Sequence, residues 1–258
     1  MTLYDENTER LDEINENLKL IQLKKGLTFG TDSYLLAAFA RTKPSGLCVE
    51  LGGGTGVVSL LAASRNKYKK IYAAEIQPYF GELIARNAKL NSLGNKVYSL
   101  LADVRTLTPG NFGTEADSVL SNPPYMRSSS GKDNASEEMN IARREENGCI
   151  SDFCAAASRL LRHGGYFTVV YRPDRLAELL SAMTAARLEP KRLVLVYPTA
   201  ADKPCLVLAE GKKGAAPGIV LSRPLLIYSD KSARTFTADM NAVYDTFSLE
   251  HLFQGVFA

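Results

Sequence analysis

The sequence predicts an α/β fold with a seven-stranded, mostly parallel sheet, helices on both faces and an antiparallel final strand. Short apolar runs alternate with amphipathic stretches, and polar or glycine-rich residues follow several of the runs. The expected strands lie at 46–51, 70–75, 96–101, 117–121, 165–171, 190–197 and 204–210. Because open parallel sheets bind ligands at the carboxyl ends of their strands, the residues after each run are the candidates for a site.

Amphipathic stretches between these runs predict the helices. In 78–91, 150–161 and 173–186, apolar residues recur on one side at helical spacing. Gly164-Gly165 is expected to end the second helix, and a proline opens the third. The linker 198–204 is too short for a helix, so the last two strands should pair antiparallel.

Length and composition indicate one enlarged domain. The chain has 258 residues, of which 45% are hydrophobic and 23% charged, with a formal net charge of +3. We expect the domain to cover 46–247, preceded by a hairpin and helix extension at 1–45 that packs on the site expected at the strand ends, and followed by a tail at 248–258. No run approaches the roughly 20 apolar residues of a membrane span, so no membrane is expected and the cytoplasm is the expected location.

Metal chemistry is not expected. The four cysteines lack C-x-x-C spacing, and only His163 and His251 are available as histidine ligands or bases. The sequence therefore predicts no metal site and no histidine-based catalytic triad.

The first expected strand runs into a glycine-rich turn. Glu50 is followed by Gly52, Gly54 and Gly56, and then by a helical pattern. Glycines at these positions allow the backbone to approach a ligand closely. A nicotinamide dinucleotide fingerprint needs a third glycine at 57 or 59, and neither position carries one. An acidic residue ahead of G-x-G-x-G instead resembles the first motif of S-adenosylmethionine-dependent methyltransferases.

The next two strands end in acidic residues. Glu75 is expected to accept hydrogen bonds from the two ribose hydroxyls of a cofactor, with Ile76 packed on its adenine. Asp103 can accept from the adenine amino group, and the Val104 backbone can donate to the ring. The alternatives are that Glu75 is an ordinary surface residue and that Asp103 caps a turn.

After the fourth strand comes Asn122-Pro123-Pro124-Tyr125. Two prolines stiffen this loop. The Asn122 side-chain oxygen and the Pro123 carbonyl can accept hydrogen bonds from a planar amine, while Tyr125 offers a stacking face. The motif resembles that of amino-group methyltransferases; the alternative is a strand-ending turn with a packed tyrosine.

As a whole, the chain resembles the bacterial tRNA adenine-N6 methyltransferases that modify the adenine 3′ of the anticodon of a valine tRNA. The resemblance covers roughly residues 9–245, and its more particular stretches are 29–37 and 172–176. It implies S-adenosylmethionine as cofactor, bound by Glu50, the loop glycines, Glu75, Asp103 and Asn122. It also implies that Asn122, Pro123 and Tyr125 hold the target base and that the partner is a tRNA anticodon loop.

Basic residues near the tetrapeptide are candidates for phosphate contacts around a flipped base. They are Arg127, Lys132, Arg143 and Arg144. A second basic patch is expected from Lys191, Arg192, Lys212 and Lys213. The alternative for both basic groups is that they are ordinary solvated surface.

Asp32 lies at the start of an expected helix. It either faces the cofactor or caps that helix.

Other activities remain open at this point. A protein glutamine-N5 methyltransferase also holds a planar amide, and N2-guanine or N6-adenine methyltransferases act on rRNA or DNA. A scaffold without activity is the rival from another class. The sequence does not distinguish a monomer from a homodimer.

Overall fold

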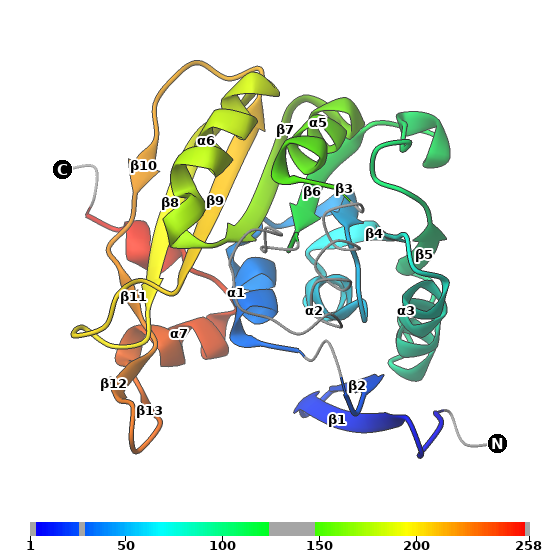
Figure 1. The fold of residues 1–258 in the computed structure, drawn as a ribbon, viewed down its shortest axis with the longest axis horizontal. Helices are drawn as coiled ribbons and strands as arrows, with labels where there is room; N and C mark the ends of the chain where they lie inside the picture. Colours follow the sequence, from blue (N-terminus) through cyan, green and yellow to red (C-terminus); the bar gives the residue numbers. More distant parts are fainter. Residues whose placement is uncertain (1–3, 26–28, 124–147, 256–258) are drawn as a thin grey trace, which may run out of the picture.

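The computed structural model describes residues 4–25, 29–123 and 148–255. Its centre is one sheet with the strand order β10-β8-β9-β7-β6-β3-β4-β5 (Figure 1). These strands are β3 (Lys43–Leu51), β4 (Tyr68–Glu75), β5 (Val97–Leu101), β6 (Ala116–Ser121), β7 (Leu161–Tyr171), β8 (Leu188–Tyr197), β9 (Leu206–Lys213) and β10 (Val220–Leu221). All seven expected strands are confirmed as β3 to β9.

The sheet is parallel except for β9, which pairs antiparallel with both β7 and β8. The short linker 198–204 therefore joins two antiparallel strands, as predicted. Two short strands, β10 and β11 (Leu225–Leu226), extend the sheet beyond the seven expected strands by pairing parallel with β8. The α/β fold class is confirmed.

Helices cover both faces of the sheet because its central strands are buried on both sides. Neighbouring strand residues alternate between two apolar clusters, as Cys48 and Val49 do. On one face lie α1 (Thr31–Phe39), α2 (Val57–Ser64), α3 (Pro78–Leu90) and α7 (Ala238–Thr246), and on the other α5 (Ile150–Leu160) and α6 (Leu176–Ala185). The 3₁₀ turns are η1 (Pro109–Asn111), η2 (Pro173–Arg175) and η3 (Glu250–Phe253).

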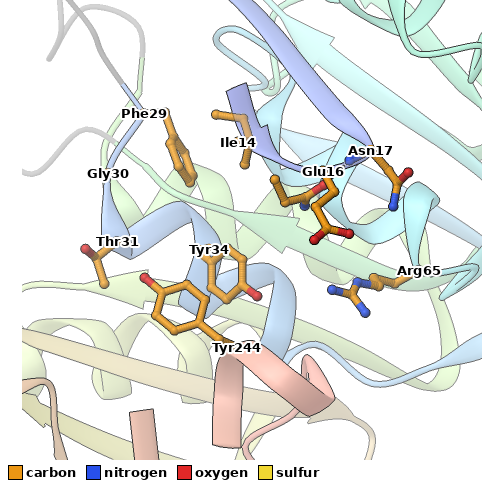
Figure 2. A pocket seen from close by; sticks show the side chains of 10 residues that line it. Ile14, Glu16, Asn17, Phe29, Gly30, Thr31, Tyr34, Arg65 and Tyr244 are labelled. Carbon is orange, nitrogen blue, oxygen red and sulfur yellow. Dashed lines mark hydrogen bonds between the residues drawn. The ribbon is translucent and has the colours of Figure 1, made fainter. Parts of the chain in front are cut away.

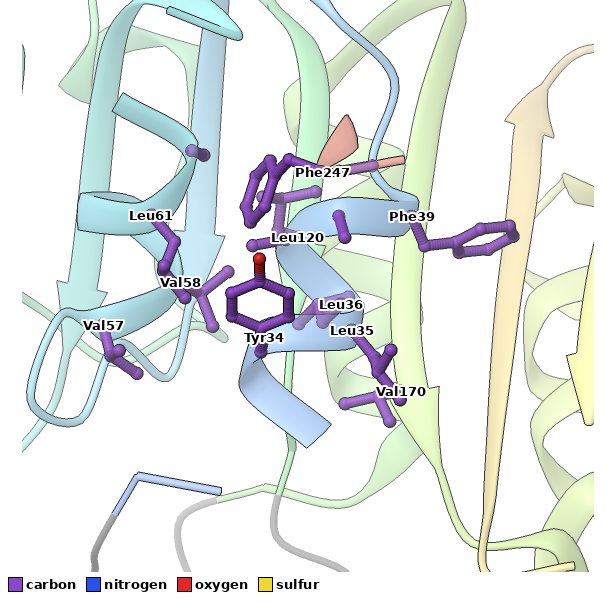
Figure 3. Packing of buried hydrophobic residues seen from close by; sticks show 14 of the residues in the cluster. Tyr34, Leu35, Leu36, Phe39, Val57, Val58, Leu61, Leu120, Val170 and Phe247 are labelled. Atoms are coloured by element: carbon purple, nitrogen blue, oxygen red, sulfur yellow. The ribbon is translucent and has the colours of Figure 1, made fainter. Parts of the chain in front are cut away.

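Helix α1 is enclosed on several sides. Every residue from Ser33 to Phe39 is buried. Figure 3 shows Tyr34 of α1 facing Val58 of α2 and Phe247, which follows α7. A helix held in this way gives its first turn a fixed position at the edge of the sheet where the candidate site residues lie.

The N-terminal hairpin consists of β1 (Glu9–Asn15) and β2 (Leu18–Leu23). A hairpin was expected within the extension at 1–45, and it spans residues 9–23. It lies beside α3 (Figure 1), where Asn87 and Asn91 bind its backbone. Glu9 adds an ion pair with Arg86 of the same helix at 2.6 Å.

The C-terminal part adds β12 (Tyr228–Asp230), β13 (Thr235–Phe236), α7 and η3. The described part of the tail packs into the main core, because Leu249, Leu252 and Phe253 are buried in the same cluster as α1. Glu250 forms an ion pair with Arg192.

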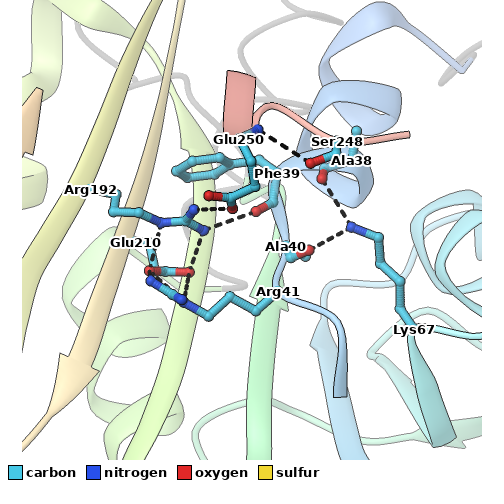
Figure 4. Close-up of polar contacts among 9 residues, drawn as sticks. All are labelled: Ala38, Phe39, Ala40, Arg41, Lys67, Arg192, Glu210, Ser248 and Glu250. Atoms are coloured by element: carbon cyan, nitrogen blue, oxygen red, sulfur yellow. Dashed lines mark hydrogen bonds and ion pairs between the residues drawn. The ribbon is translucent and has the colours of Figure 1, made fainter. Parts of the chain in front are cut away.

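The second basic patch is not formed as expected, because Arg192 is buried. Its guanidinium pairs with the buried Glu210 at 2.8 Å and lies over the ring of Phe39 (Figure 4). Arg41 binds the same carboxylate at 2.9 Å. The charge of Arg192 is neutralised by carboxylates inside the protein, so the prediction that Arg192 belongs to a phosphate-binding patch was wrong.

Candidate active site

The candidate residues meet at one edge of the sheet because strand register aligns them. Leu51 of β3 pairs with Ser121 of β6 and with Ala74 of β4. The residues that follow these three positions are Gly52, Asn122 and Glu75. The buried Ser121 hydroxyl also donates to the Leu51 carbonyl at 2.9 Å, which ties the start of the glycine turn to the start of the Asn-Pro segment.

The glycine turn has the conformation that its residues predict. Gly52, Gly54 and Gly56 have φ of +73°, +51° and +82°, in the left-handed region that favours glycine. Gly56 is the residue before α2. A Cβ at Gly54 would meet no atom within 4 Å, so this part of the turn faces open space where a ligand can approach the backbone.

Glu75 is held against this turn. One carboxylate oxygen accepts from the Gly54 amide and the other from the Gln77 amide, each at 2.9 Å. Ile76 follows it and is half-buried. The carboxylate is thus oriented at the end of β4 beside the open face of the turn, where a cofactor ribose was expected.

Glu50 lies deeper than the other candidates. Its side chain is buried and accepts hydrogen bonds from the amide and hydroxyl of Ser59 in α2. Burial raises the pKa of Glu50 to about 8, although the bonds from Ser59 oppose the rise. Its predicted contact with a cofactor remains a prediction.

Asp103 lies two residues beyond β5, the strand next to β4. Its carboxylate pairs with Arg105 at 2.5 Å, and this hydrogen bond holds the pKa of Asp103 below its usual value. Val104 is buried. An adenine amino group would have to share or displace the Arg105 contact.

Asn122 is oriented by α1. Its Nδ2 donates to Asp32 Oδ2 at 2.8 Å and approaches the Ser33 hydroxyl at 3.4 Å. Asp32 is not the N-cap of α1, which is Gly30; its second oxygen accepts from the Ser33 amide at 2.8 Å. With the amide nitrogen turned toward Asp32, the Asn122 oxygen is directed away from α1.

Pro123 is buried and ends the described part of this loop. Tyr125, Arg127, Lys132, Arg143 and Arg144 lie outside the described residues. Their predicted roles stay predictions.

Asn87 is a polar site residue that the sequence reasoning missed. Its fully buried side chain accepts from the Ile21 amide at 2.7 Å and donates to the Ile21 carbonyl at 3.0 Å and the Thr55 carbonyl at 2.9 Å. It therefore connects the hairpin, α3 and the glycine turn. Its spacing from Leu83 and Ile84 places it on the apolar side of the helix, and a polar residue there is the signal that could have found it.

Within the residues that the structure describes, no cluster of three or more His, Cys, Asp or Glu side chains could hold a metal ion. No helix in the described ranges is long and apolar enough to cross a membrane.

The fold and the site together define a Rossmann-like methyltransferase domain, with a glycine turn after the first sheet strand, an acidic residue at the end of the second and Asn-Pro after the fourth. A family model described as the TRM5/TYW2 methyltransferase domain matches residues 37–150. The chain belongs to the tRNA1(Val) (adenine(37)-N6)-methyltransferase family.

Two relatives support this membership. The tRNA1(Val) (adenine(37)-N6)-methyltransferase of Flavobacteriaceae bacterium (strain 3519-10) is 30% identical over 192 residues, which are 68% of this chain and 79% of the relative. That of Bacteroides fragilis is 29% identical over 186 residues, 71% of this chain and 77% of the relative.

Solved structures agree on the fold. A protein of Agrobacterium tumefaciens described as a predicted O-methyltransferase superposes with a TM-score of 0.67 at 20% identity, covering 84% of this chain and 97% of that one. P. horikoshii TYW2 in complex with MeSAdo gives a TM-score of 0.58 at 17% identity, with coverage of 82% and 74%.

Proposed function

We propose that this protein transfers a methyl group from S-adenosylmethionine to the exocyclic N6 of an adenine in tRNA, at the position 3′ of the anticodon of a valine tRNA. The observation that carries the proposal is the family membership, combined with an Asn-Pro segment that register places beside the glycine turn. Action on tRNA would place the protein in the cytoplasm.

The cofactor site fits such a group. The glycine turn exposes backbone at Gly54, and Glu75 lies next to it with both oxygens oriented by amides. S-adenosylmethionine, when bound, supplies an electrophilic methyl group on a positively charged sulfur. The protein binds and aligns the two reactants, and alignment of reacting groups lowers a barrier by about 7 to 11 kcal/mol.

The amine is held by acceptors. The N6 lone pair of adenine is delocalised into the ring, so the nitrogen has to pyramidalise before it can attack. The Asn122 oxygen and the Pro123 carbonyl would accept from the two amine hydrogens and hold them out of the ring plane. Asn122 and Pro123 would hold the nitrogen ready to take the methyl group, and the proton that the nitrogen then loses would pass to solvent without a strong base. Tyr125 would stack on the base.

The other activities differ in what becomes methylated. A glutamine-N5 methyltransferase would label a protein, an N2-guanine enzyme would produce a methylated guanine, and an N6-adenine enzyme for rRNA or DNA would label those nucleic acids instead of tRNA. The family relatives are named for tRNA adenine modification, which favours the adenine.

The test is transfer of labelled methyl from S-adenosylmethionine into bulk tRNA from a host that lacks this enzyme, followed by nucleoside analysis. We expect N6-methyladenosine, which should disappear in Asn122→Ala. The matched control is Asn95→Ala, at an exposed asparagine before β5, which should keep full activity. Label found in protein, or in guanine, would contradict the proposal.

A further inference from the structure

A cavity of about 540 Å³ lies next to the candidate active site. Its walls are the turn of the N-terminal hairpin, the start of α1, the end of α2 and the helix α7 (Figure 2). Gly30 and Thr31 form one wall, directly before Asp32, which holds Asn122. This wall of the cavity is therefore continuous in the chain with the residue that orients Asn122. Among the residues that the structure describes, none with an assigned role in cofactor or amine binding lines it.

Aromatic rings form its apolar side. Phe29, Tyr34 and Tyr244 line the cavity, and Figure 2 shows the ring of Tyr244 beside that of Tyr34. Tyr34 is buried, so the half-buried rings of Phe29 and Tyr244 provide the accessible surface. Ring faces of this kind bind nucleobases by stacking.

The Tyr244 ring is held rigidly. It packs on Tyr34 with ring centroids 4.8 Å apart and on Phe236 of β13 at 5.2 Å. Phe236 stacks in turn on Tyr228 of β12 at 5.4 Å. A ring fixed by neighbours on two sides loses little conformational entropy when a base stacks on it.

Polar groups surround the rings. Figure 2 shows the Arg65 guanidinium and the Glu16 carboxylate turned toward the same space, with Asn17 beside them. Burial raises the pKa of Tyr34 to about 12, so its hydroxyl stays a neutral hydrogen-bond donor. Amide, carboxylate and hydroxyl groups suit the edge of a base and the ribose, and the guanidinium suits a phosphate.

Arg65 also lines a second cavity of about 520 Å³, which lies at the C-terminal ends of α1 and α2. The two cavities share the cationic Arg65. This arrangement suits a nucleic-acid strand that continues past the first cavity better than it suits a small isolated ligand.

We infer that this cavity is a second base site, which binds an unpaired nucleotide of the RNA next to the methylated adenine. The base lies against Phe29 and Tyr244, and its phosphate lies toward Arg65. This inference rests on the proposed function, because it takes the ligand to be the same RNA strand. An unpaired loop offers such neighbours without the melting of a duplex.

The test combines protein variants with RNA variants. An anticodon stem-loop is prepared with a single abasic site at each position within three nucleotides of the target adenine, and its binding is measured with S-adenosylhomocysteine present. Tyr244→Leu should weaken binding of the intact stem-loop about tenfold. At one RNA position, the abasic site should weaken binding to the wild type by the same factor as Tyr244→Leu weakens binding of the intact stem-loop. The same abasic site should have no further effect in the Tyr244→Leu variant.

Controls separate stacking from folding and from charge. Tyr244→Phe keeps the ring and should bind like the wild type, while Tyr98→Leu, on the distant strand β5, removes a ring outside the cavity and should have no effect. Arg65→Gln should weaken binding and reduce its salt dependence, unlike Lys69→Gln at an exposed position of β4.

The inference is overturned if the effects of Tyr244→Leu and the abasic sites multiply at every position, or if Tyr244→Leu behaves like Tyr98→Leu. A wild-type protein that binds S-adenosylhomocysteine but methylates no RNA would instead refute the proposed function, and the inference with it.

Discussion

Asp32 Oδ2 accepts a 2.8 Å hydrogen bond from Asn122 Nδ2, and this contact decides which way the Asn122 amide points. The other Asp32 oxygen accepts from the Ser33 amide. Both oxygens of the carboxylate are thus acceptors for donors fixed by the fold. Since a carboxylate has no donor when ionised, Asn122 can meet it only with its nitrogen.

Asp32→Asn should disturb this orientation. An asparagine at this position has one oxygen, and if that oxygen stays on the Ser33 amide, its nitrogen faces Asn122 and favours a flipped amide. We expect kcat to fall about 10- to 100-fold, which corresponds to the loss of one charge-assisted hydrogen bond. Single-turnover methyl transfer into tRNA measures the effect. Ser33→Ala removes only the 3.4 Å contact and should cost less than threefold; equal losses in both variants would contradict this role of Asp32.

Asn87 and Asn91 make similar contacts with the hairpin, but only the first also binds the glycine turn. Asn87→Leu leaves buried donors and acceptors at Ile21 and Thr55 unpaired, so it should reduce the free energy of unfolding by about 2 to 4 kcal/mol and weaken cofactor binding. Asn91→Leu loses the analogous bonds to Lys19 at an exposed site and should cost under about 1 kcal/mol. Urea unfolding and calorimetric binding of S-adenosylhomocysteine compare the two. Unchanged cofactor affinity in a folded Asn87→Leu protein would show that the link to Thr55 does not matter.

Local patterns predicted the sheet well because each strand is a short apolar run in which both faces are buried. The boundary between α5 and β7 was harder. Gly164-Gly165 was expected to end the helix, but α5 ends at Leu160 and β7 starts at Leu161, where that residue pairs with Ala116 of β6. A pairing across 45 residues overrides the local glycine signal there.

Side-chain partners that are distant in the sequence explain the other differences. The hairpin residues 9–15 are mostly polar, and Glu9 among them is attached through Arg86 of α3, 77 residues away. In the sequence Arg192 looks like a surface charge, because its partner Glu210 lies on another strand, β9. The positions of Glu50, Glu75 and Asn122 could be predicted because each lies within one residue of the carboxyl end of a strand, whereas the groups that orient them come from other elements.

The attachment of the hairpin should depend on pH. A hydrogen bond from Arg86 holds the pKa of Glu9 at about 2, against an ordinary value of 4.5. The stabilisation is therefore complete above pH 4.5 and is lost as the pH falls toward 2, with a loss of about 2 kcal/mol by pH 3. Hydrogen exchange of β2 amides should quicken between pH 5 and pH 3 relative to the intrinsic rates. Glu9→Gln should remove this dependence, while the exposed Glu6→Gln should retain it; the same profile in both variants would contradict the role of Glu9.

Glu50 should show a conflict between stability and cofactor binding. Its folded pKa of about 8 lies above the ordinary 4.5, so the buried carboxyl binds a proton that the unfolded chain releases. The neutral Glu50 carboxyl makes its full contribution to the free energy of unfolding below pH 4.5, and this contribution is lost as the pH rises through 8. Glu50→Gln keeps a neutral group and an acceptor for Ser59, so it should be more stable than the wild type by about 2 to 4 kcal/mol at pH 8 and equally stable near pH 4.5.

The same substitution should weaken binding of S-adenosylmethionine if the Glu50 carboxylate faces the positive charge of the cofactor. Binding would then release a proton, and wild-type affinity should rise between pH 6 and pH 8 by up to about tenfold per pH unit, whereas Glu50→Gln should show a flat profile. Calorimetry in buffers of different ionisation enthalpy counts the released proton. A flat wild-type profile together with a more stable Glu50→Gln would mean that Glu50 acts only through Ser59 and the position of α2, and that its direct contact with the cofactor was predicted wrongly.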